Sequence, residues 1–154
     1  MDNHTAKEKL LMTFLNHYSF PIFETKASDF AKNMIPPLIK PSAIKRIQWH
    51  QEKHHRCIII SAGLENYITP WAYSIGITEV LATRITVENN NLSGKMLGKN
   101  CYGPEKVSRL EKLLDQNIQA IKENYTLFAY GDSRGDQELL ATADFPFYQT
   151  MPAG

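Results

Sequence analysis

Amphipathic stretches with helical spacing fill the first third of the chain. Apolar side chains recur at helical intervals over residues 6–18, which predicts a first helix. A second helix is predicted over residues 28–34, where Ser28 provides a capping oxygen and the prolines that follow end the helix. A third helix is predicted over residues 41–54, since proline is tolerated at a first helical position.

From residue 57 onward, short apolar runs alternate with further amphipathic stretches. The run at residues 57–60 predicts a strand buried on both faces of a parallel sheet. The later predictions are a helix over 65–75, a strand over 79–82, a hairpin over 83–96, a helix over 104–114, a strand over 126–130, a helix over 137–143 and a strand over 145–148. This alternation favours an α/β fold, a parallel sheet with helices on both faces, in which ligands bind beyond the carboxyl ends of the strands.

The composition favours one globular domain, with 43% hydrophobic and 21% charged residues among 154. A formal net charge of +1 provides no general attraction to nucleic acid or membrane, so an anionic ligand would need a local site. The apolar runs are too short to span a bilayer and no signal-peptide pattern opens the sequence, so a cytoplasmic enzyme or binding domain is expected. Cys57 and Cys101 form no CxxC pattern, which argues against a disulfide framework or a zinc cage.

Histidines gather near the end of the third predicted helix. His50 and His54 share a helix face by their spacing, and such a pair would suit a metal. The plainer interpretation is a set of cations near a helix C-terminus, where the helix dipole favours positive charge.

A serine and a glycine follow the first predicted strand. Ser61, Ala62 and Gly63 would place a hydroxyl and backbone N–H groups at the start of a helix, where both favour an anion. Small side chains also let a phosphate approach the backbone. The same residues often serve for capping alone, so both interpretations stay open.

Two carboxylates and a lysine complete the candidate residues. Asp132 and Asp136 follow a later predicted strand, and such a pair suits a hard cation such as magnesium, which takes oxygen ligands. Asp136 could instead cap the helix that follows. Lys106 stands at the start of a predicted helix, where the dipole disfavours a cation. A solvated lysine is the plain alternative, but this unfavourable place suggests a functional role.

Together these residues resemble the haloacid dehalogenase superfamily, in its phosphoserine-phosphatase-like subfamily. The superfamily uses a serine or threonine after its second strand, a lysine before or on a later helix, and acidic residues after the next strand. The corresponding residues here are Ser61, Lys106, Asp132 and Asp136. The resemblance runs from about Phe14 onward, through IIISAGLENYITPWAYSIGITEVLATRITV, LSGKMLGKNCYGPEKVSRL and YGDSRGDQELLATADFPFY.

The resemblance implies hydrolysis of a phosphate monoester through a phospho-aspartyl intermediate, with Mg²⁺ as cofactor. Asp132 would ligate the metal, and Asp136 would hold the metal's water shell or a neighbouring group. Lys106 would neutralise the charge of the nucleophile and of the transferred group, because phosphoryl transfer depends on positioning and electrostatic stabilisation. The phosphate oxygens would be held by Ser61, Ala62, Gly63 and Lys106.

The family's first motif, D-x-D-x-T after a strand, does not occur in the sequence. Asp2 has only Met1 before it and cannot end a strand, and Asp29 lies in an amphipathic stretch. The resemblance therefore implies N-terminal truncation, with residues 1–40 as a partial helical cap and residues 41–154 as a core without its central first strand. Such a core is expected to be marginal, oligomeric or rearranged, because neighbouring strand edges lose their partner.

Two hypotheses follow for the function. The first is an active family phosphatase, acting on a small phosphorylated substrate, of which this chain is a truncated product. The second is a non-enzymatic remnant that binds a phosphate or a protein partner. A homo-oligomer could close the gap left by the missing strand in either case, and no nucleic-acid or membrane partner is expected.

Overall fold

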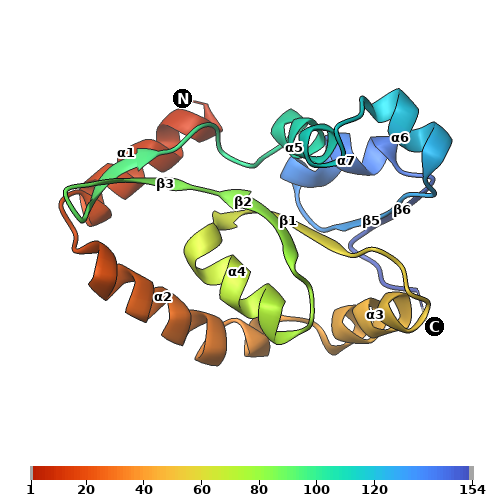
Figure 1. The fold of residues 1–154 in the computed structure, drawn as a ribbon, viewed down its shortest axis with the longest axis horizontal. Helices are drawn as coiled ribbons and strands as arrows, with labels where there is room; N and C mark the ends of the chain where they lie inside the picture. The colour runs from red at the N-terminus through yellow and green to blue at the C-terminus, as the bar shows by residue number, and fades with distance from the viewer. Residues whose placement is uncertain (1, 153–154) are drawn as a thin grey trace. The chain divides into compact units, whose positions relative to one another are not determined.

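The computed structural model describes residues 2–152, and Figure 1 shows its ribbon. Contacts divide the chain into two compact units. Unit 1 comprises Met1–Ile39 and Ile58–Cys101, and unit 2 comprises Lys40–Cys57 and Tyr102–Gly154. The predicted boundary at residue 40 between cap and core stays a prediction, since unit 1 groups the first helices with the first parallel strands.

The order of elements follows the predicted alternation of helices and strands. Unit 1 contains α1 (Asn3–Leu15), α2 (Phe20–Asn33), η1 (Pro36–Leu38), β1 (Ile58–Leu64), α4 (Glu65–Ser74), β2 (Glu79–Thr83), β3 (Ile85–Glu88) and β4 (Asn91–Met96). Unit 2 contains α3 (Pro41–Glu52), α5 (Pro104–Leu114), α6 (Ile118–Asn124), β5 (Phe128–Gly131), η2 (Arg134–Asp136), α7 (Gln137–Thr142) and β6 (Phe145–Tyr148). Among the described helices, none is both long and apolar enough to cross a bilayer.

Helix α2 begins earlier than the sequence pattern predicted. Its first residue is Phe20, and the Ser19 side chain caps it by accepting a hydrogen bond from the backbone N–H of Ile22. Pro21 stands at the start of the helix, where its fixed backbone angle is favourable. The predicted cap, Ser28, lies inside the helix, so that assignment was wrong.

Strand β1 pairs in parallel with β2 and continues beyond its predicted end. Ile60 pairs with Leu81, and the next registered pair is Leu64 with Thr83, so the intervening residues form a bulge. Residues 61–63 therefore lie in an irregular part of a strand rather than in a turn. The sequence suggested a turn because a serine and a glycine end the β-branched run.

The apolar run of β1 is less buried than the sequence predicted. Ile58, Ile59 and Ile60 are half-buried rather than enclosed on both faces. Within the described residues, β2 is the only strand that pairs with β1, so one edge of β1 lacks a strand neighbour. The absence of a central strand from the whole fold stays a prediction.

Strands β3 and β4 form the predicted antiparallel hairpin. Asn89 and Asn90 have positive φ angles of 49° and 65°, which suit the tight turn of a twisted hairpin. Helix α1 packs on this hairpin, and the backbone N–H of His17 donates to the carbonyl of Leu92 at 2.7 Å. The buried core formed here contains Leu11, Leu64, Ile85, Leu92 and Met96.

Strands β5 and β6 pair in parallel in unit 2, and helices lie on both faces of this pair. Phe128 and Tyr130 face α3, where their ring centroids lie 5.1 and 5.6 Å from that of His50. Gly131 points to the opposite face by strand alternation and lies against Asp136 of η2. The predicted α/β fold, with parallel strands and helices on both faces, is confirmed.

Candidate active site

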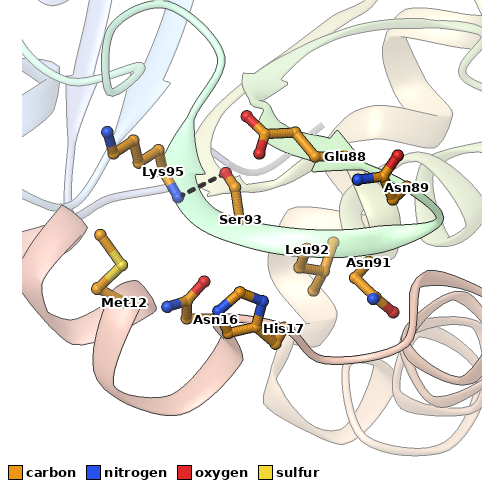
Figure 2. A pocket seen from close by; sticks show the side chains of 9 residues that line it. All are labelled: Met12, Asn16, His17, Glu88, Asn89, Asn91, Leu92, Ser93 and Lys95. Carbon is orange, nitrogen blue, oxygen red and sulfur yellow. Dashed lines mark hydrogen bonds between the residues drawn. The ribbon is translucent and has the colours of Figure 1, made fainter.

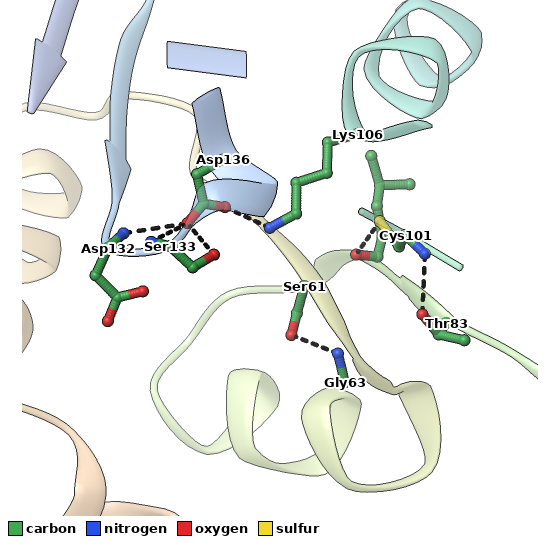
Figure 3. A network of polar contacts seen from close by, with 9 residues as sticks. Ser61, Gly63, Thr83, Cys101, Lys106, Asp132, Ser133 and Asp136 are labelled. Carbon is green, nitrogen blue, oxygen red and sulfur yellow. Dashed lines mark hydrogen bonds and ion pairs between the residues drawn. The ribbon is translucent and has the colours of Figure 1, made fainter. Parts of the chain in front are cut away.

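A buried ion pair forms the centre of the candidate site in unit 2 (Figure 3). The Nζ atom of Lys106 lies 2.5 Å from Oδ1 of Asp136, and the two side chains are 7% and 10% exposed. Lys106 stands in the first turn of α5, which begins at Pro104 as predicted. The pair therefore ties the start of α5 to the segment that follows β5.

The other carboxylate oxygen of Asp136 accepts three hydrogen bonds. The backbone N–H groups of Asp132 and Ser133, together with the Ser133 hydroxyl, donate to Oδ2, each at 3.1 Å. Ser133 and Asp136 thereby form a reciprocal capping box around η2. Both carboxylate oxygens of Asp136 are thus engaged by the protein's own donors, but they accept no capping hydrogen bond from α7, the helix that follows, so the predicted cap of that helix was wrong.

The environment of Asp136 favours its ionised form. Burial raises the pKa of this carboxyl, but the hydrogen bond and charge of Lys106, with the N–H groups of Ser133 and Asp132, outweigh burial and hold the pKa below its usual value. Asp136 is therefore charged at neutral pH. It balances the Lys106 ammonium without help from a ligand.

Asp132 is exposed, in contrast to Asp136. It uses its backbone N–H and C=O for hydrogen bonds, and its carboxylate has no partner among the described residues. Magnesium usually keeps several waters and takes only one or two protein carboxylates. Asp132 fits that requirement, although no cluster of three or more His, Cys, Asp or Glu side chains gathers in residues 2–152.

Two glycines allow the segment after β5 to close around Asp136. A Cβ atom on Gly131 would lie 2.5 Å from Cβ of Asp136. A Cβ atom on Gly135 would lie 2.5 Å from the ring of Tyr102, the residue that precedes the α5 cap. Both distances are shorter than nonbonded carbon contacts allow, so the seating of Asp136 requires glycine at both positions.

Ser61 lies in unit 1, in the bulge of β1. Its Oγ atom accepts a hydrogen bond from the backbone N–H of Gly63 at 3.0 Å (Figure 3). Because this bond uses Oγ only as an acceptor, the hydroxyl proton remains available for a ligand oxygen. The Gly63 N–H, which the resemblance assigns to a phosphate, is satisfied here by Ser61.

A polar cluster that the sequence did not predict lies beside this bulge, and we name it the Lys7–Asn100 cluster. Lys7 of α1 donates from Nζ to the backbone carbonyl of Ala62 and, at 3.0 Å, to Oδ1 of Asn100. The same Oδ1 accepts from Oγ1 of Thr83 at 3.0 Å, and the Asn100 amide donates to Asn3. No local pattern marks Lys7, because its partners lie far along the chain.

The predicted site residues thus fall into two groups. Lys106 and Asp136 are paired within unit 2, and Asp132 adjoins them through its backbone N–H, while their roles stay a prediction. Ser61 belongs to unit 1 with the Lys7–Asn100 cluster. We call these groups the Lys106 half-site and the Ser61 half-site and describe each by itself.

His50 pairs with His55 rather than with His54, contrary to the spacing argument. Its Nδ1 lies 2.8 Å from Nδ1 of His55, and its Nε2 lies 2.8 Å from the hydroxyl of Tyr130, which also accepts from Nε of Arg46. Burial, followed by the charges of Arg46 and His55, lowers the pKa of His50 to about 4. Both ring nitrogens of His50 are hydrogen-bonded, which leaves neither of them for a metal.

A cavity of about 330 Å³ lies elsewhere in unit 1, between α1 and the β3–β4 hairpin (Figure 2). Met12 and His17 line it from one side, and Glu88 and Lys95 line it from the hairpin. None of the predicted site residues contributes to this lining.

Comparison with known proteins identifies relatives over most of the chain. The sequence is 28% identical over 144 residues to the protein CicA of Caulobacter vibrioides, which covers 93% of this chain and 62% of that protein. It is 27% identical over 119 residues to a histidinol-phosphatase of Neisseria meningitidis, which covers 77% of this chain and 54% of the relative. The chain therefore spans between half and two thirds of the length of these relatives.

Solved structures share the fold at lower sequence identity. A protein of unknown function from Bordetella pertussis superposes with a TM-score of 0.74 at 21% identity, over 92% of this chain and 63% of that one. A phosphoserine phosphatase solved as an analogue of its phospho-aspartyl intermediate superposes with a TM-score of 0.61 at 17% identity, over 93% and 63%. The haloacid dehalogenase-like hydrolase family matches residues 2–141. With that match, the chain belongs to the haloacid dehalogenase-like hydrolase family.

Proposed function

We propose that this chain carries the phosphate- and magnesium-binding groups of a phosphomonoesterase and that it does not turn over a phosphate monoester by itself. The observation that supports the first part is the buried Lys106–Asp136 pair beside the exposed carboxylate of Asp132. A lysine ammonium and a carboxylate without a protein partner in the same segment of unit 2 support binding of a phosphate and a metal ion. Family membership and the phosphatase among the relatives support the same reaction class.

Each residue has a distinct part in this proposal. Asp132 would hold the magnesium ion, which when bound neutralises charge on the phosphate. Lys106 would offset the charge of the transferred group, held in position by its bond to Asp136. Ser61 would donate its free hydroxyl proton to a phosphate oxygen. Asp136 would act as a positioning residue, because its own oxygens are already engaged.

The proposed lack of turnover follows from the missing nucleophile. A phospho-aspartyl intermediate requires an aspartate with a free carboxylate at the end of a strand, and D-x-D does not occur among the 154 residues. Asp136 is engaged by four donor contacts, and Asp132 would be committed to the metal. The alternative is a non-catalytic remnant that binds phosphate or a protein partner.

Hydrolysis of para-nitrophenyl phosphate with Mg²⁺ tests the proposal. We expect no turnover above that of an Asp132→Asn variant, whereas inorganic phosphate should bind in calorimetry and the variant should lose the Mg²⁺ dependence of that binding. Turnover that depends on Asp132 would show that the assignment of the missing nucleophile is wrong. An unchanged phosphate affinity in Lys106→Met would contradict the proposed role of Lys106.

The genomic DNA upstream of the Met1 codon separates the two hypotheses. An apolar run followed by D-x-D-x-T, in frame or after a frameshift, would support the phosphatase. Absence of that motif from every upstream frame would favour the non-catalytic remnant.

A further inference from the structure

The ammonium of Lys7 has an unusual environment for a lysine on the first helix of the chain. The residue is half-buried, and its two hydrogen-bond acceptors are the neutral carbonyl oxygens of Ala62 and Asn100. No carboxylate of the described residues forms an ion pair with it. Burial lowers the pKa of Lys7, and a smaller electrostatic effect of Cys101 raises it. A partly desolvated cation without an anionic neighbour is energetically unfavourable.

The Lys7 ammonium lies beside the bulge of β1, where its charge favours an anionic ligand. It binds the carbonyl of Ala62, the residue next to Ser61, whose hydroxyl proton has no acceptor among the described residues. The bulge of β1 therefore carries a free O–H donor at Ser61, and the next residue holds the Lys7 ammonium of α1 through its carbonyl. An oxyanion bound there would satisfy both at once.

The neighbours of Lys7 hold its side chain in place. Oδ1 of Asn100 accepts from Lys7 and also from Thr83, and the Asn100 amide donates to Asn3 of α1. Thr83 and Asn100 are buried, so this anchor has little freedom to move. The cluster therefore fixes the cation beside the bulge before any ligand is present.

We propose that Lys7 is an anion-binding residue of the Ser61 half-site and that, with the Ser61 hydroxyl, it contacts the phosphate of a phosphate monoester. This inference deepens the proposed function and rests on it. It assigns to the first helix a direct contact with the ligand, beyond its packing on the hairpin. Asn100 is a positioning residue, because it acts through Lys7.

Calorimetric titration with inorganic phosphate in the presence of Mg²⁺ tests the assignment. We expect Lys7→Met to weaken phosphate binding by about tenfold or more, since it removes a charged hydrogen-bond donor. Lys7→Arg should retain most of the affinity. Lys9→Met, which removes an exposed lysine of the same helix, is the matched control and should bind like the unchanged chain.

Asn100→Asp separates a binding role from a structural one. The new carboxylate would keep the acceptor for Lys7 and supply the counter-ion that it lacks, so phosphate binding should fall. The melting temperature of the ligand-free protein should change by only a few degrees, because the new ion pair offsets the lost amide bond to Asn3. Unchanged phosphate affinity in both Lys7→Met and Asn100→Asp would overturn the proposal.

The titration also tells this failure from a failure of the proposed function. If the unchanged chain binds phosphate and Lys106→Met weakens binding while Lys7→Met does not, only the role of Lys7 is wrong. If the unchanged chain binds no phosphate, both proposals are overturned.

Discussion

The Lys106–Asp136 pair of unit 2 and the Lys7–Asn100 cluster of unit 1 both hold a lysine ammonium out of full contact with water. Only Lys106 has a carboxylate partner, at 2.5 Å. Lys7 has carbonyl oxygens alone. The charge of Lys106 is compensated by a carboxylate of the protein, whereas the charge of Lys7 is not and is proposed to bind a ligand. We call the first lysine compensated and the second uncompensated, and we expect them to respond differently to mutation.

The largest effect is expected from breaking the compensated pair. Asp136→Asn would leave the Lys106 ammonium buried without its counter-ion, which typically costs about 3–5 kcal/mol. It would also weaken the acceptor for the Asp132 and Ser133 N–H groups. The free energy of unfolding in urea, measured without phosphate or metal, reports this loss.

Glu65→Gln provides the matched control for that measurement. Glu65 pairs with Arg84 at 3.2 Å, and the two side chains are 42% and 56% exposed. Exposed pairs contribute about 0–1 kcal/mol, because water and salt screen them. Equal losses in Asp136→Asn and Glu65→Gln would contradict the view that the buried pair organises unit 2.

The second prediction concerns the pH dependence of stability and the hydrogen-bond network of His50 in unit 2. His50 has a pKa of about 4 in the folded chain against 6.5 for its ordinary value, so the unfolded chain binds more protons between these values. Stability should therefore fall as pH drops from about 6.5 to 4, by about 3 kcal/mol in total.

His50→Gln should flatten this part of the pH profile of unfolding. Asp136 cannot account for the slope, because its folded pKa lies below 3.8 and the stability it contributes is lost only at lower pH. If the free energy of unfolding of the unchanged chain stays constant between pH 6.5 and 4, the pKa of His50 is not lowered in the folded chain.

The compensated half-site was predictable from sequence, because its residues are placed by local rules. Helix α5 has the predicted bounds, Pro104–Leu114, since a proline at its start and an amphipathic pattern define it. Lys106 follows from that placement, and Asp132 and Asp136 follow from the end of β5. Their roles in charge and metal binding stay predictions.

The uncompensated half-site was not predictable in the same way. Lys7 contacts Ala62 and Asn100 across sequence separations of 55 and 93 residues, and no periodic pattern carries such information. The bulge at residues 61–63 is also a register property of β1 and β2 together. Helix α6, Ile118–Asn124, was also missed, although Asn117 caps it by accepting a hydrogen bond from the backbone N–H of Ala120 and is a local signal for its start.

The smallest effect is expected from removing the uncompensated lysine in the absence of ligand. Lys7→Met would lose two hydrogen bonds, each contributing about 1 kcal/mol, but it would also remove a half-buried charge without a counter-ion. These effects oppose each other, so unfolding in urea without phosphate should change by less than about 1 kcal/mol. A loss as large as that of Asp136→Asn would mean that Lys7 is a structural anchor, whereas a small loss combined with weaker phosphate binding would mean that its charge is kept for the ligand.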